Sequence, residues 1–161
     1  MQKKTLKLIS VVTLFCIAMA FLESVIVIYL RKLYYPNGFS FPLRGFIEPS
    51  VLQVEIFREF STIVMLLCVA YLAGKKFYDK FAYFMLGFAV WDIFYYVWLK
   101  LILDWPVSLL TWDVLFLIPW VWVGPVLAPI ISSLTMVGLC FSILSLQDKG
   151  YSFKINVKEW L

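Results

Sequence analysis

The sequence predicts an all-α, polytopic integral membrane protein with four transmembrane helices in a single membrane domain. Its composition is the first observation: 63% of the residues are hydrophobic, 15% are charged, and the mean hydropathy is +0.92. A soluble domain is about 45–50% apolar and about 25% charged, so too few polar residues are present here to cover a water-exposed surface. The second observation is a set of four apolar segments, each long enough to reach the roughly 20 residues with which a helix crosses a bilayer.

The first three predicted spans have recognisable boundaries. Residues 8–30 form the first span, which is interrupted only by Glu23 and is longer than the core of a signal peptide, about 7–15 residues. Residues 51–73 lie between a Pro-Ser pair, which favours a helix start, and a glycine, which favours a helix end. Residues 80–103 follow Asp79, a candidate cap, and end before an Asp-Trp-Pro turn.

The fourth span is preceded by a segment that proline interrupts. Residues 114–146 carry no charge and would reach roughly 50 Å as one straight helix, which is more than the hydrocarbon thickness of about 30 Å. Three prolines in the first half remove backbone donors and break the helix. We therefore predict a short helical or re-entrant segment at 108–118, a turn near 119–125 and a fourth span at 126–146. One long kinked helix is the alternative.

The distribution of Lys and Arg predicts that both termini are cytoplasmic. An excess of these residues marks the cytoplasmic side of a membrane protein, and in this orientation nine of the fourteen lie there, at positions 3, 4, 7, 75, 76, 80, 149, 154 and 158. Residues 31–50 then form an outer loop, rich in aromatic residues and turn signals, and residues 147–161 form a cytoplasmic tail. The expected location is the cell membrane, with multiple passes.

Charged residues inside the predicted spans concentrate in the outer half. Glu23 lies seven residues before the outer end of the first span and Arg58 seven residues into the second, so both lie about 10 Å below the same boundary. Ionised groups at the centre of a membrane helix cost about 2.5–3.5 kcal/mol and face the interior or pair. We therefore predict an interior polar cluster made of Glu23, Glu55, Arg58, Glu59, Asp92, Tyr95, Tyr96, Lys100 and Asp113.

This cluster has several interpretations. Its five carboxylates and two cations leave a surplus of three negative charges, which protonation, water, a bound cation or a basic residue of a partner would relieve. The favoured interpretation is structural, with Arg58 bridging Glu23 and a carboxylate of its own helix to hold two spans together. A proton or cation path, a catalytic carboxylate pair, docking of a partner and lipid-headgroup binding are the alternatives. For Asp92, a hydroxyl from Tyr95 or Tyr96 is the expected hydrogen-bond partner, and a proton or quinone site is the alternative.

Six tryptophans predict an aromatic girdle, because Trp is enriched where a membrane protein meets the bilayer surface. The first four recur every seven residues, but Pro106 interrupts the helix that would align them, so only the first two share a face. The predicted girdle consists of Trp91, Trp98, Trp105, Trp112, Trp120 and Trp122.

The residue inventory excludes several chemistries. The chain has no histidine and three scattered cysteines, so the usual ligands and bases of zinc hydrolases, haem proteins, iron–sulfur proteins and Ser-His-Asp enzymes are missing. No phosphate-binding loop is present, and the basic residues gather at span ends rather than on one nucleic-acid-binding surface. We predict no catalytic residue, metal site or resident cofactor. We expect bound lipid and leave a contact with a quinone or pigment open.

Three functions fit these constraints. The leading hypothesis is an accessory or structural subunit of a larger membrane complex, of an energy-converting type (electron-transfer or photosynthetic), whose partners are lipids and other membrane subunits. The second is a small cation- or proton-coupled transporter that uses Glu23, Arg58, Glu59 and Asp92. The third is a lipid-modifying membrane enzyme, for which a cavity open to lipid at the level of Asp92 would be the distinguishing feature.

Overall fold

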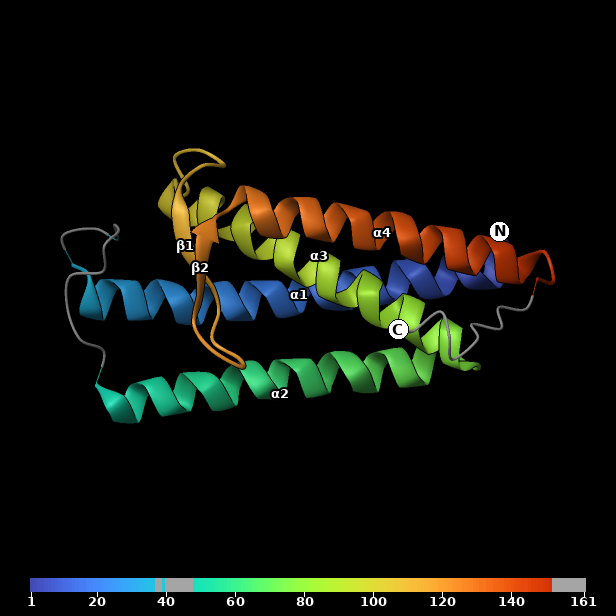
Figure 1. The fold of residues 1–161 in the computed structure, drawn as a ribbon, viewed down its shortest axis with the longest axis horizontal. Helices are drawn as coiled ribbons and strands as arrows, with labels where there is room; N and C mark the ends of the chain where they lie inside the picture. Colours follow the sequence, from blue (N-terminus) through green and yellow to red (C-terminus); the bar gives the residue numbers. More distant parts are fainter. Residues whose placement is uncertain (37–38, 40–47, 152–161) are drawn as a thin grey trace.

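The computed structural model describes residues 1–36, 39 and 48–151, which form four long helices and one two-stranded hairpin (Figure 1). The elements are α1 (Lys3–Tyr34), α2 (Pro49–Ala73), α3 (Phe77–Leu103), β1 (Trp112–Phe116), β2 (Trp122–Pro125) and α4 (Leu127–Asp148). All four helices are long and apolar enough to cross a membrane. The prediction of four helices of spanning length is therefore confirmed.

The helices alternate in direction, so the first and last meet at one end of the bundle. The carboxylate of Asp148 accepts hydrogen bonds from the Gln2 backbone N–H at 2.7 Å and from the Thr5 hydroxyl at 2.9 Å. We call this the termini end, and the opposite end, where the hairpin lies, the hairpin end (Figure 1). Gly74 makes the tight turn between α2 and α3 at the termini end, since a Cβ at this position would lie 2.4 Å from the Lys80 backbone nitrogen.

The central helix is α3, which packs against each of the other three, whereas α1 and α2 contact each other little. Gly87 of α3 permits this close approach, because a Cβ there would come within 3.2 Å of both Cys16 on α1 and Leu66 on α2. Polar groups also join α1 to α3: the Ser24 hydroxyl donates to the Tyr95 carbonyl, and the Trp98 indole donates to the Ile17 carbonyl. The bundle is therefore held from the inside by α3.

The segment before α4 is a β-hairpin, so the helical form of the predicted segment at 108–118 and the alternative of one long kinked helix are both wrong, whereas a re-entrant position of this segment stays a prediction. Trp112 pairs with Pro125 and Asp113 with Gly124 in an antiparallel register. Proline lacks a backbone donor, and here one proline, Pro119, lies in the loop between the strands while another ends β2. Strand geometry alternates side chains between two faces, which buries Asp113 and leaves Trp112 exposed.

Helices α1 and α3 extend beyond their predicted bounds. Helix α1 continues through residues 31–34, which were assigned to the outer loop, and thereby carries Arg31 into the bundle. Helix α3 begins at Phe77 because Asp79 caps it from inside, accepting a hydrogen bond from the Lys76 backbone N–H at 3.0 Å. Most of the predicted outer loop (37–38 and 40–47) and of the tail (152–161) lies outside the described residues.

Candidate functional site

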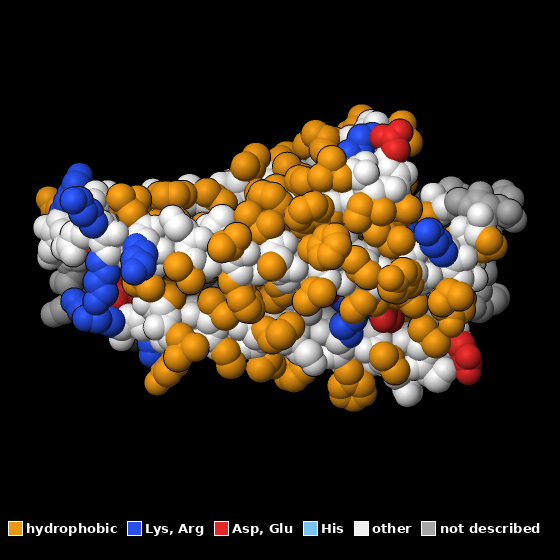
Figure 2. Space-filling view, turned by 180° about the vertical axis from the view of Figure 1, so that it is seen from behind, with side chains coloured by type: hydrophobic (Ala, Val, Ile, Leu, Met, Phe, Trp, Pro, Cys, Tyr) orange, Lys and Arg blue, Asp and Glu red, His pale blue; other side chains and the backbone are white. Residues whose placement is uncertain are grey.

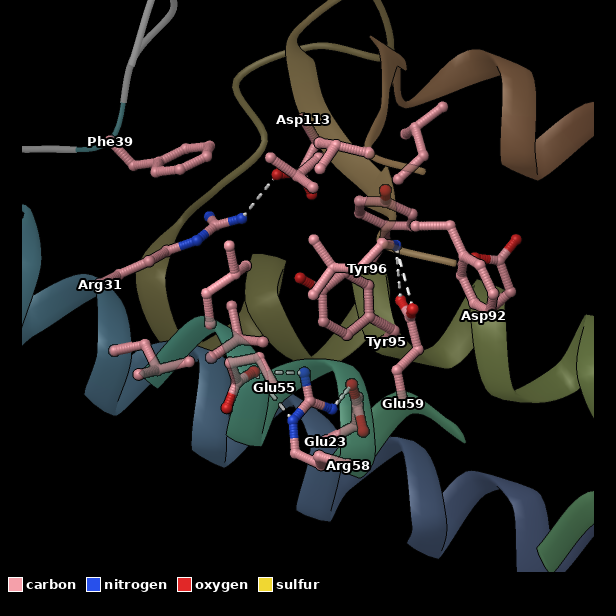
Figure 3. Close-up of a pocket in the computed structure, with 18 of the residues that line it drawn as sticks. Glu23, Arg31, Phe39, Glu55, Arg58, Glu59, Asp92, Tyr95, Tyr96 and Asp113 are labelled. Atoms are coloured by element: carbon pink, nitrogen blue, oxygen red, sulfur yellow. Dashed lines mark hydrogen bonds and ion pairs between the residues drawn. The ribbon is translucent and has the colours of Figure 1, made fainter. Parts of the chain in front are cut away.

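A cavity of about 370 Å³ opens in the hairpin-end half of the bundle, between α1, α2, α3 and the hairpin (Figure 3). This volume lies in the range of about 300–1,000 Å³ that is typical of small-molecule pockets. Its walls combine apolar and aromatic side chains with a set of ionisable ones. The ionisable lining residues are Glu23, Arg31, Tyr34, Tyr35, Glu55, Arg58, Glu59, Asp92, Tyr95, Tyr96 and Asp113.

Arg58 joins α2 to α1 across one wall of the cavity. Its Nη1 donates to Glu23 on α1, and its Nη2 and Nε donate to the Glu55 Oε2 at 2.6 and 2.9 Å. The Arg58 side chain is 19% exposed and those of both carboxylates are 11% exposed, so all three are largely removed from solvent. The residues that the depth calculation placed at one level are therefore in contact.

Glu59, one residue further along α2, holds the hairpin. Both of its carboxylate oxygens accept hydrogen bonds from the Leu117 backbone N–H at 3.0 Å. Leu117 directly follows β1, and Figure 1 shows the loop between the strands reaching across α1 to α2. Glu59 thus fixes the hairpin as the cover of the cavity, a role that the sequence did not reveal because the hairpin itself was not predicted.

A second ion pair, Arg31–Asp113, lies closer to the hairpin end. The Arg31 Nη2 donates to the Asp113 Oδ1 at 3.1 Å, and the two side chains are 9% and 2% exposed. The guanidinium lies between two rings, 4.2 Å from the centroid of Phe39 and 3.7 Å from that of Trp105, a favourable cation–π arrangement. The sequence analysis placed Arg31 in a loop. Arg31 lies eight residues after Glu23, however, and this spacing of two i+4 steps places both residues on one face if the helix continues.

The Asp113 carboxyl lies on the hairpin, outside the four helices, and its surroundings favour the neutral form. Burial raises the pKa of Asp113 to about 6, although the Arg31 guanidinium and the Val114 backbone N–H oppose this shift. A carboxyl with such a pKa exchanges its proton close to neutral pH.

Asp92 reaches the cavity from α3 and is held by the fourth helix. Its Oδ2 accepts a hydrogen bond from the Ser133 hydroxyl of α4 at 2.7 Å. The expected partner was a tyrosine hydroxyl, and Tyr95 and Tyr96 do line the same cavity. Ser133 was not singled out from the sequence, because nothing in the chain order indicates which residue of α4 faces Asp92.

Lys100 does not belong to the cluster, contrary to the prediction. Its side chain is 49% exposed and pairs with Asp104 at 2.7 Å on the outside of α3. The hydrogen bond and charge of Lys100 hold the pKa of the exposed Asp104 carboxyl below its usual range. The position of Lys100 along the helix axis did not predict its environment, because it does not specify the direction in which the side chain points.

The predicted tryptophan girdle divides into two groups. Trp91 is 6% exposed and packs against Phe116, and so is an interior residue rather than a member of a girdle. Trp98 is partly buried against the core, and Trp105 stacks on Arg31. The remaining three lie on the hairpin with exposed fractions of 54%, 74% and 55%; they are Trp112, Trp120 and Trp122.

Three buried polar atoms of cavity-lining residues have no hydrogen-bond partner within the described part of the chain: Arg31 Nη1, Asp113 Oδ2 and Trp91 Nε1. Each belongs to a side chain that is more than nine-tenths buried. Leaving such a group unpaired costs about 1–3 kcal/mol. Three residues of the cavity lining therefore each carry a buried polar atom without a partner among the described residues.

Among residues 1–36, 39 and 48–151, no group of three carboxylates or thiols is arranged to hold a metal ion. Comparisons of this chain with known protein families, with characterised proteins and with solved structures found no match. The chemistry of the cavity is consequently argued from its own geometry. Its parts are an apolar wall, three ion pairs made by two arginines, two further carboxylates and three unpaired polar atoms.

Proposed function

We propose that this chain is a multi-pass protein of the cell membrane with both termini in the cytoplasm. The four apolar helices and the exposed hydrophobic side chains along the bundle support this proposal (Figure 2). Lysines crowd the termini end, where Figure 2 shows blue side chains gathered, and include Lys3, Lys4, Lys7, Lys75, Lys76, Lys80 and Lys149. Because Lys and Arg accumulate on the cytoplasmic side, the cavity is assigned to the outer half of the membrane.

We propose further that the protein binds a small amphiphilic molecule in this cavity. The observation that carries the proposal is the set of unpaired atoms on Arg31, Asp113 and Trp91, which are buried and line a pocket with mostly apolar walls. A pocket with few convergent polar groups and apolar walls is the usual form of a ligand site. An amphiphile from the bilayer supplies both parts, since its polar group meets polar side chains of the lining and its chain lies along the aromatic wall.

Binding of dodecyl amphiphiles tests this proposal. Dodecanol, dodecylamine and dodecyl phosphate are titrated separately into the purified protein in lipid nanodiscs, and the rise in melting temperature reports binding. The test variant is Arg31→Met/Asp113→Asn, which removes the buried ion pair, and the matched control is Lys100→Met/Asp104→Asn, which removes an exposed pair at the same end. We expect at least one amphiphile to stabilise the wild type and the control, but not the test variant. Equal responses in all three proteins would refute the proposal.

Membership of a larger membrane complex is the second candidate function. The observation in its favour is the hairpin, which presents the exposed rings of Trp120 and Trp122 next to the cavity, since aromatic residues are enriched in protein interfaces. Native mass spectrometry of the chain extracted in mild detergent tests it. A reproducible partner that is lost in a Trp120→Ala/Trp122→Ala variant would support a subunit role, and a lone chain in both preparations would count against it.

The transporter and the lipid-modifying enzyme that the sequence allowed use the same cavity. The lipid-modifying enzyme requires that an amphiphile first binds there, so the titration above also tests the first step of that activity. Chemical analysis of the amphiphile after prolonged incubation separates simple binding from turnover.

A further inference from the structure

We infer that the amphiphile bound in the cavity carries an ammonium group. This inference rests on the proposed function, because it names the chemical class of the ligand of the same site. It starts from the charges of the lining residues, in which five carboxylates face two guanidiniums and leave three negative charges uncompensated.

The uncompensated charge is concentrated on two residues. Arg58 pairs with two of the carboxylates and Arg31 with a third. The other two accept hydrogen bonds only from neutral donors among the described residues, Glu59 from the backbone N–H groups of Leu117 and Ile118 and Asp92 from the Ser133 hydroxyl. The Arg58 guanidinium also attracts Glu59, but it is already shared by its two paired carboxylates. Neutral donors solvate a carboxylate but do not cancel its charge, so the interior favours an added cation at Glu59 and Asp92.

Glu59 and Asp92 lie at the same depth on different helices. Glu59 is ten residues from the hairpin-end start of α2, and Asp92 is eleven residues from the hairpin-end terminus of α3, so each lies roughly 15 Å along its helix from that end. Both line the cavity, and Figure 3 shows the two carboxylates in the same part of it. A single cationic group in the deep part of the cavity can therefore interact with both.

The rings around this position suit an organic cation. Trp91, Tyr95 and Phe116 line the cavity, and the face of an aromatic ring attracts an alkylammonium by about 0.5–2 kcal/mol. A bare inorganic cation gains less from such walls, since it needs several oxygen ligands at short distance, and no group of three carboxylates among the described residues is arranged for that. An ammonium on an apolar chain satisfies the carboxylates, the rings and the apolar wall together.

The head-group preference of the cavity tests this inference. Dodecylamine is compared with dodecanol and dodecyl phosphate in the same titration, and butylamine is added as a water-soluble amine. We expect dodecylamine to bind the wild type at least tenfold more tightly than dodecanol, and dodecyl phosphate to bind more weakly than either. Weak binding of butylamine would show that the apolar chain contributes to binding and would assign the ligand to the bilayer. If butylamine binds as tightly as dodecylamine, the ligand carries an ammonium group but is not an amphiphile.

Variants that each remove one charge show which carboxylates cause the preference for dodecylamine over dodecanol. Asp92→Asn keeps an acceptor for the Ser133 hydroxyl, and Glu59→Gln keeps one for the Leu117 N–H, so each removes charge with little change of shape. Either change should lower the preference for dodecylamine over dodecanol about tenfold, whereas Glu48→Gln, an exposed charge loss at the same end, should leave it unchanged.

Two failures are distinguishable. If the wild type binds dodecanol or dodecyl phosphate as tightly as dodecylamine, and the Arg31→Met/Asp113→Asn variant binds none of them, the ammonium inference is overturned and the amphiphile site stands. If every amphiphile binds the wild type and that variant equally, both the amphiphile site and the ammonium inference are refuted. A preference for dodecylamine that survives Asp92→Asn and Glu59→Gln together would also overturn the inference.

Discussion

Replacing Arg58 by methionine is expected to lower the free energy of unfolding by about 3 kcal/mol. Arg58 donates to Glu23 on α1 and, at 2.6 and 2.9 Å, to Glu55 on its own helix. Removing one member of a buried ion pair costs about 3–5 kcal/mol, because the partner charges remain buried and unpaired. The side chains here are 11–19% exposed, so some water reaches them and the lower end of that range applies.

The effect should be largest between α1 and α2, because these helices have few other contacts. Reversible unfolding in mixed micelles, with increasing SDS in dodecyl maltoside and helix content followed by circular dichroism, gives the free energy. The triple variant Arg58→Met/Glu23→Gln/Glu55→Gln neutralises the stranded carboxylates and should recover at least half of the loss, since the uncompensated charge is what destabilises the single variant.

An exposed pair provides the control. Lys100→Met breaks a contact with a fully exposed carboxylate and should leave the stability unchanged, as most surface ion pairs do. The reasoning fails if Arg58→Met costs less than about 1 kcal/mol, or if the triple variant is as unstable as the single one. Either result would mean that the carboxylates are not held in a water-poor interior by this guanidinium.

Three further predictions concern the hairpin, the core and the titration of the buried pair. Glu59→Ala removes both acceptors of the Leu117 N–H, so exchange of that amide with solvent should accelerate and stability should fall by about 1–2 kcal/mol; unchanged exchange would contradict the hairpin anchor. Gly87→Val overpacks a site where even a Cβ comes within 3.2 Å of Leu66. It should lower the free energy of unfolding by about 1–3 kcal/mol in the same assay, whereas an unchanged free energy would show that α2 moves away freely. The pKa of Asp113 is raised from 3.8 to about 6, so the folded state holds this proton more tightly than the unfolded chain, and stability should fall as pH rises through that interval. When unfolding is measured from pH 4 to 7, the slope should be smaller in Asp113→Asn than in the wild type, and an identical slope in both proteins would assign it to other groups.

The sequence by itself determined the four apolar helices and the level at which Glu23 and Arg58 meet. Both follow from constant quantities, since a span of hydrocarbon needs about 20 apolar helical residues and an α-helix rises 1.5 Å per residue wherever it occurs. Counting residues along two antiparallel helices is then enough to place two charges at one depth.

Only the tertiary structure decided which polar side chains face the cavity. Lys100 and Asp92 lie on the same helix, yet one points outward to Asp104 and the other inward to Ser133. The rotation of a helix about its axis depends on packing against its neighbours, which the mean hydropathy of a uniformly apolar helix does not record. Arg31 entered the site for a related reason, because α1 continues past its apolar run and meets an aspartate from the hairpin.

The hairpin is the clearest case of tertiary determination. A short apolar run with prolines is compatible with a broken helix and with a strand, and periodicity alone does not separate them. Pairing of β1 with β2 and the capture of the Leu117 N–H by Glu59 satisfy backbone groups that a strand in isolation would leave unpaired. These partners are distant in sequence and adjacent only in the fold, so the cover of the cavity was decided by long-range contacts.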